Sequence, residues 1–153
     1  MSSSINSIVP FPRKPGFRGN LSREFHWLRW DEQPSFQRRL EQNRLILLDH
    51  LGTPLLETLA ANRPMLAYWK PSHWEVREEA LPYLEELRQA GILLEFPEAA
   101  AGRTVELHPN PSEWWNSRPV QEARERFVQR YALSETKWEQ QWSRALNNEL
   151  SLA

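Results

Sequence analysis

The chain has 153 residues, which fits one domain and is too short for an enzyme built from two α/β domains. Charge is balanced, with 19 Lys and Arg against 20 Asp and Glu, so the basic face typical of nucleic-acid-binding domains is not expected. No apolar run approaches the ~18 residues of a membrane-spanning helix, and the absence of cysteine excludes disulfides and thiol nucleophiles. We therefore expect a cytoplasmic protein with no membrane span and no nucleic-acid partner.

Residues 1–24 are predicted to form an irregular N-terminal arm, because prolines and glycines interrupt every periodic pattern in this part of the chain. The folded domain is then expected to span residues 25–153. Its first helix is predicted over 35–43, with Ser35 as the N-cap residue.

The centre of the chain predicts a short βαβ unit. Residues 45–48 form a continuous apolar run, as expected for a strand that is buried on both faces. A loop over 49–54 follows, and apolar residues at helical spacing then predict a helix that ends at 62–64. Residues 65–69 predict a second buried strand. Two strands joined through a helix pair in parallel.

The second half of the chain predicts one more strand among several helices. Ser72 and Glu75 match a capping box that opens a helix, and Pro82 predicts a kink in it or two abutting helices. Gly91 is predicted to end this helix before a third strand over 92–94. Further helices are expected over 98–107, from Pro119 as the first helical position, and from Ser134 with Trp138 and Trp142 four residues apart.

The predicted fold class is therefore α/β: a small, Rossmann-like parallel sheet of few strands, with flanking helices and a helical C-terminal third.

The junction between the first strand and its helix carries the best candidate site. Thr53 is predicted as N-cap and Pro54 as the first helical residue. Backbone N–H groups at this helix start would point into the crevice beyond the carboxyl end of the strand, where open α/β sheets bind ligands. Such helix starts favour phosphates. Glu57, one turn further on, could accept hydrogen bonds from a ribose or sugar hydroxyl.

A plainer interpretation of the same residues remains open. Gly52 and Thr53 could simply make a turn and cap a helix. One glycine falls short of G-x-G-x-x-G, and neither a Walker lysine nor G-x-S-x-G is present.

The other candidate groups indicate structural roles more than chemistry. His73 and Glu75 form H-x-E, but the cysteines of zinc deaminases are missing, so a helix-start role is favoured. His26, His50 and His108 lack metal-ligand spacing, and we predict no metal and no cofactor. Trp69, at the end of the second strand, is the best aromatic candidate for the crevice.

The run from Arg44 to Pro64 resembles the C-terminal signature of a transferase family from bacterial surface-polysaccharide gene clusters, first grouped around leptospiral lipopolysaccharide loci. Several further motifs match in order at similar spacing: Trp69 to Arg77, Pro82 to Leu84, Leu87 to Ile92, Pro97 to Ala100, Trp114 to Asn116, Val120 to Arg124 and the closing tryptophan segment. The sequence departs from the family's pattern at Lys70, where an acidic residue is usual.

This resemblance implies a GT-B-type glycosyltransferase, whose C-terminal, Rossmann-like half holds the nucleotide-sugar donor. By that resemblance Gly52 and Thr53 would cradle the donor phosphate, and Glu57 would contact the ribose or sugar. Asp49, His50 and Trp69 complete the expected donor-binding set, and no catalytic residue is assigned.

The expected function is donor binding in lipopolysaccharide or surface-polysaccharide biosynthesis. The N-terminal acceptor half of such enzymes has no counterpart in the sequence, so we expect a lobe that is truncated or encoded separately and is inactive alone. The alternative is a non-catalytic protein-interaction module derived from such a lobe. A lobe without its partner half would expose an apolar face, which predicts self-association.

Overall fold

The computed structural model describes residues 26, 35–70, 72, 75–133, 140, 143–144 and 147. Contacts within the chain divide it into two units, Met1–Arg39 and Leu40–Ala153. The predicted irregular arm, residues 1–24, lies outside the described residues. The sheet and the helices that follow its first strand belong to the second unit, and the helix over Phe36–Gln42 spans the boundary between the two units.

The described elements alternate between helices and short strands. In chain order they are α2 (Phe36–Gln42), β1 (Ile46–Leu48), α3 (Thr53–Ala60), β2 (Met65–Tyr68), the 3-10 helix η2 (Glu78–Ala80), α4 (Leu81–Gln89), β3 (Leu93–Leu94), α5 (Pro97–Leu107), α6 (Pro111–Trp115) and α7 (Arg118–Tyr131).

The three strands form a parallel sheet in the order β1-β2-β3. Ile46 pairs with Met65 across the first interface, and Ala67 pairs with Leu93 across the second. Helix α3 makes the crossover from β1 to β2, and α4 leads into β3. The sequence-based prediction of an α/β fold with a parallel sheet, flanking helices and a helical C-terminal part is therefore confirmed.

The prediction that the first strand is buried on both faces is wrong for Leu47, which is 42% exposed. Its neighbours Ile46 and Leu48 are 7% and 5% exposed. Side chains alternate between the two faces of a strand, and β1 stands at one end of the strand order. The principal helix contacts of the sheet involve β2 and β3, so the second face of β1 is left partly open.

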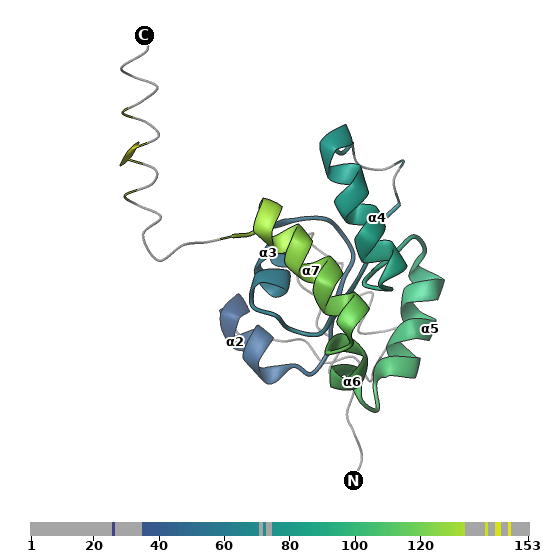
Figure 1. Cartoon of the computed structure of the whole chain (residues 1–153). Helices are drawn as coiled ribbons and strands as arrows, with labels where there is room; N and C mark the ends of the chain where they lie inside the picture. The colour runs from purple at the N-terminus through teal and green to yellow at the C-terminus, as the bar shows by residue number, and fades with distance from the viewer. Residues whose placement is uncertain are drawn as a thin grey trace. The chain divides into compact units, whose positions relative to one another are not determined.

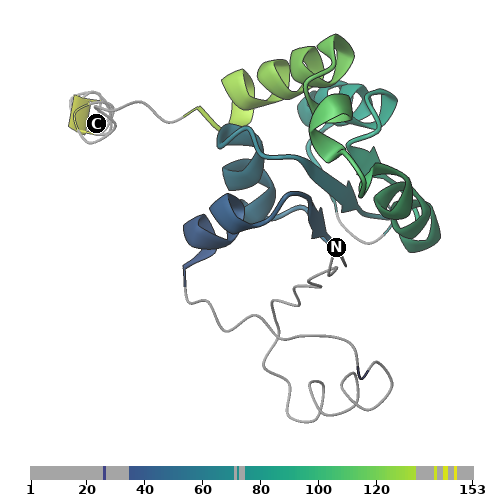
Figure 2. The same cartoon turned by 90° about the horizontal axis from the view of Figure 1, so that it is seen from below.

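Helix α7 closes the core on one side by packing against both α3 and α4 (Figure 1). Its buried residues Val120, Ala123 and Phe127 recur at helical spacing and form one apolar face. Figure 2 shows the same layer, with α7 lying over the helices that flank the strands. Central side chains such as Leu59 and Leu87 are fully buried.

The helix after the capping box begins later than the sequence predicts, and the helix at Pro119 begins one residue earlier. No helix runs on from the capping box at Ser72 and Glu75, because residues 75–77 are irregular and η2 begins only at Glu78. Helix α4 then follows with Pro82 in its first turn, which confirms the prediction of two abutting helices. Pro119 is the second residue of α7, not its first. The predicted last helix lies mostly outside the described residues.

The C-terminal end of α3 is held by a hydrogen-bond network that joins it to α6 and α7. Asn62 adopts a left-handed conformation with φ of 50°, and Arg63 N–H donates to the Thr58 carbonyl, as in a Schellman motif. The indole Nε1 of Trp115 donates to Asn62 Oδ1 over 2.8 Å. Arg124, a buried residue of α7, donates from Nη1 to the Leu59 carbonyl over 3.0 Å.

Replacing Arg124 by Met should therefore destabilise the fold. The variant keeps much of the apolar stem but loses hydrogen bonds from a buried charged group, each worth about 1.5–3 kcal/mol. We expect the free energy of unfolding in urea to fall by about that amount. Arg118→Met is the matched control, since this side chain is 87% exposed and its loss should leave stability unchanged. Equal stability of the two variants would contradict the anchoring role.

Replacing two of the glycines by alanine should change the free energy of unfolding in opposite directions. Gly91 has φ of 72° at the end of α4, where an L-residue is strained by roughly 1–2 kcal/mol. Gly102 lies within α5, and an added Cβ would meet nothing within 4 Å. Gly91→Ala should lower the free energy of unfolding by about 1 kcal/mol, and Gly102→Ala should raise it by about 0.8 kcal/mol. Chemical denaturation measures both.

Candidate functional site

A pocket of about 430 Å³ opens beside the start of α3. Part of its wall follows the carboxyl end of β1, and another part belongs to the segment between β2 and α4, so it occupies the edge where parallel α/β sheets bind ligands. The pocket is lined by Leu51, Gly52, Thr53, Leu55, Leu56, Glu75, Val76, Arg77, Glu79, Ala80, Leu84, Phe127 and Tyr131.

Helix α3 begins one residue earlier than predicted. Gly52 is the N-cap residue, Thr53 is the first helical position and Pro54 the second, so the prediction of Thr53 as N-cap is wrong. No side chain caps this helix start. Leu55 N–H donates to the Gly52 carbonyl, whereas Thr53 N–H has no hydrogen-bond partner within the described ranges. A free amide therefore stands where Thr53 lines the pocket.

The lack of a side chain at Gly52 makes room for the ring of His50. A Cβ at Gly52 would come within 2.8 Å of His50 Cδ2 and 2.9 Å of His50 Nε2, closer than real Cβ contacts. The φ of Gly52 is −133°, an extended conformation open to any residue. Gly52 thus allows the close approach of the His50 ring, whereas its backbone conformation does not call for glycine.

Asp49 and His50 form a pair just beyond the carboxyl end of β1. His50 Nδ1 lies 2.7 Å from Asp49 Oδ1, and the two side chains are 45% and 64% exposed. Tyr68, the last residue of β2, belongs to the same edge of the sheet. Burial, and to a lesser extent the negative charge of Asp49, raise the pKa of the Tyr68 phenol above its ordinary value.

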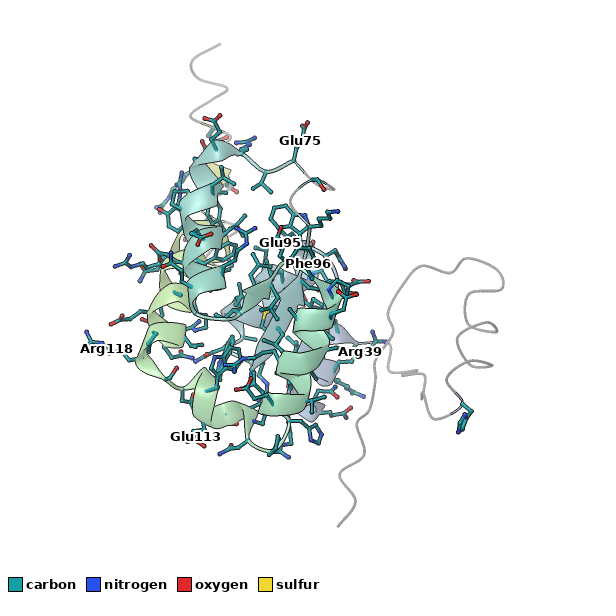
Figure 3. The ribbon with its side chains drawn as sticks, turned by 90° about the vertical axis from the view of Figure 1, so that its right-hand side faces the viewer. Arg39, Glu75, Glu95, Phe96, Glu113 and Arg118 are labelled. Atoms are coloured by element: carbon teal, nitrogen blue, oxygen red, sulfur yellow. The ribbon has the colours of Figure 1, made fainter. Side chains whose placement is uncertain are left out.

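The walls of the pocket are mainly apolar. Aliphatic and aromatic side chains from α3, α4 and α7 form its depth, among them Leu55, Leu84 and Phe127. Its polar side chains come chiefly from the segment before α4, where Arg77 lies 3.6 Å from Glu79 in an exposed ion pair. Figure 3 shows Glu75 on this segment, far from Glu113 on α6 within the second unit.

Two of the six predicted donor-binding residues, Gly52 and Thr53, line the pocket. Asp49 and His50 do not line the pocket but directly precede Leu51, which does. Glu57 is exposed on α3 and does not line the pocket. Trp69 is only 6% exposed, does not line the pocket either, and has the guanidinium of Arg88 5.6 Å from its ring centre. His73 lies outside the described residues.

Sequence reasoning missed the far walls of the pocket. Ala80, Leu84, Phe127 and Tyr131 come from η2, α4 and α7, and their helical spacing marks them only as core residues. Arg77 could have been singled out from the sequence, because it follows the second strand and the carboxyl ends of parallel strands meet at one edge of the sheet. Among the described residues, no three His, Asp or Glu side chains gather as metal ligands would.

Comparison with known protein families gives a match over nearly the whole chain. A family model described as "LIC12162 family transferase" matches residues 8–146. The chain belongs to this transferase family. Searches among curated proteins and among solved structures each returned no match. None of the described helices is both long and apolar enough to span a bilayer.

The raised pKa of Tyr68 has a measurable consequence at high pH. The folded protein holds the phenol proton to a higher pH than the unfolded chain, whose tyrosines titrate near ~10. The associated stability is present below about pH 10 and is lost as the pH rises through the folded-state value. We expect Tyr68→Phe to show a smaller fall in unfolding free energy between about pH 9 and 11.

Asp49→Asn serves as the companion variant. It should lower the pKa of Tyr68 part of the way, because burial, the larger cause, remains. NMR titration of ring-labelled tyrosine measures the change, and an unchanged midpoint would show that Asp49 has no influence on this phenol.

Proposed function

We propose that the chain is the donor-binding lobe of a glycosyltransferase-like enzyme of surface-polysaccharide biosynthesis, and that the pocket beside α3 binds a nucleotide-sugar. Membership of the transferase family supplies the reaction class. The observation that carries the proposal is the uncapped start of α3, with Gly52 and Thr53 in the wall of a pocket at the carboxyl edge of the sheet.

The two kinds of wall suit the two ends of such a donor. A phosphate oxygen would accept a hydrogen bond from Thr53 N–H, with the positive end of the α3 dipole behind it. The apolar depth, which includes Phe127, would hold the flat face of a base. Arg77 brings a positive charge to the polar side of the pocket. The acceptor would be bound by a second domain.

Glu57 and Trp69 have no part in the proposed binding mode. Glu57 points away into solvent from α3, and Trp69 is buried away from the pocket wall. The proposal therefore rests on backbone amides and on the residues that line the pocket.

A second candidate is a protein-interaction module. The apolar character of the pocket favours it, because Leu51, Leu56 and Val76 could equally accept an apolar side chain of a partner or of a second copy. This function would not depend on the amide of Thr53, so one experiment separates the two.

Replacing Thr53 by Pro removes the backbone donor together with the side-chain hydroxyl, and the effect of losing the hydroxyl is measured separately by the control variant Thr53→Ala. Gly52 already has the extended conformation that precedes proline (φ −133°, ψ −173°), and proline is favoured at the first helical position. A hydrogen bond to a charged group is worth about 1.5–3 kcal/mol. We expect Thr53→Pro to weaken nucleotide-sugar binding about tenfold to hundredfold by calorimetry. CMP-, UDP- and GDP-linked sugars are the ligands to titrate.

Thr53→Ala is the matched control, since it removes the hydroxyl but keeps the amide, and its affinity should remain within about threefold of the original. Circular dichroism confirms that both variants fold. Failure of the original chain to bind any of the three nucleotide-sugars would contradict donor binding and favour the interaction module.

A further inference from the structure

The pair formed by Asp49 and His50 has the geometry of an oriented imidazole. The 2.7 Å contact to Asp49 Oδ1 engages Nδ1 of the ring, and the carboxylate can only accept, so Nδ1 carries the proton. Nε2 is then the unprotonated nitrogen of the neutral ring. It lies over Gly52, next to the pocket wall.

Stability gives little reason for this arrangement. Both side chains are about half exposed or more, and exposed pairs of this kind contribute little to folding. The ring nevertheless occupies the space that any other residue at position 52 would fill with its Cβ. The local sequence thus leaves a half-exposed imidazole beside Gly52, which is one of the residues that line a ligand-sized pocket.

We propose that His50 is a catalytic residue that removes the proton from the acceptor hydroxyl, and that Asp49 is the residue that positions its ring. The inference rests on the proposed glycosyl transfer and adds a chemical role to the same edge of the sheet. A base within reach of the reacting hydroxyl commonly contributes about 10²–10⁴-fold in rate.

The step balances as a displacement at the anomeric carbon of the bound donor. The acceptor hydroxyl passes its proton to Nε2 of His50, while its oxygen forms a bond to the anomeric carbon. The bond from that carbon to the donor phosphate oxygen breaks, and the departing nucleotide keeps the electron pair. Asp49 accepts the hydrogen bond from Nδ1 throughout and stabilises the imidazolium that forms.

The first experiment examines the ring itself in the full-length chain. Nitrogen NMR of ¹⁵N-labelled histidine distinguishes a protonated Nδ1 from a protonated Nε2. We expect the neutral ring of His50 to carry its proton on Nδ1, and Asp49→Ala to shift the proton toward Nε2. A proton on Nε2 in the unaltered chain overturns the inference, whatever the ligand of the pocket.

The second experiment separates binding from turnover. With water as the acceptor, His50→Gln should reduce hydrolysis of the best-bound nucleotide-sugar about 10²–10⁴-fold, while its Kd for the donor stays within about threefold. Asp49→Ala should cause a smaller loss of rate with an unchanged Kd. His108→Gln, at the end of α5, is the matched control and should behave like the original chain.

Each remaining outcome is decisive. Loss of donor binding in His50→Gln in proportion to its loss of turnover would make His50 a binding residue and overturn the inference. If the chain binds the donor without hydrolysing it, as a lobe that is inactive alone would do, the NMR measurement decides the inference. If no nucleotide-sugar binds at all, the proposed function fails, and the NMR measurement alone then decides whether the oriented pair exists.

Discussion

The rest of the site depends on the position of α3, and contacts at the C-terminal end of this helix fix that position. Arg124 donates to the Leu59 carbonyl, and Trp115 donates to the side chain of Asn62. Both contacts fix the C-terminal end of a helix of only eight residues, whose two ends are roughly 12 Å apart. A shift of the anchored end would therefore be felt at Gly52 and Thr53.

The pocket combines features that have different physical origins. Its apolar depth is a consequence of packing, since α3, α4 and α7 leave space where their side chains meet. Its free amide is a consequence of helix geometry, because the first turn of any helix has unpaired donors unless a side chain caps them. No side chain caps the start of α3, and the ring of His50 lies beside Gly52 at this helix start. The proposed ligand site needs both features, because it combines an apolar depth with a free amide.

Much of the fold was accessible from the sequence because the signals were local. Apolar runs at 45–48 and 65–69 marked two strands, and the stops at Asn62 and Gly91 marked helix ends that both adopt left-handed backbone. The exposure of Leu47 could not be predicted from the sequence, because it depends on the place of β1 in the strand order. The start of α4 was missed because a capping pattern at Ser72 cannot show whether the following residues find a surface to pack against.

Only part of the site could be predicted from the sequence, because some of its residues are brought together by packing between distant segments. The strand-to-helix junction at 49–54 follows from chain order, so Gly52 and Thr53 could be singled out. Phe127 and Tyr131 reach the pocket only through the packing of α7 on α3 and α4, a contact between segments far apart in sequence. Trp69 shows the opposite error, because a strand-end aromatic residue can equally be directed into the core, where it is 6% exposed.

The parallel register also dictates the order in which this protein can assemble. Ile46 must meet Met65, and Ala67 must meet Leu93, so each pairing waits for an intervening helix to close the loop. Helix α7 is synthesised after all three strands, yet it covers both α3 and α4. While the chain is still emerging from the ribosome, those parts of the two helices that pack against α7 stay uncovered until Phe127 has been added. That interval is when the nascent polypeptide is most exposed to misassociation.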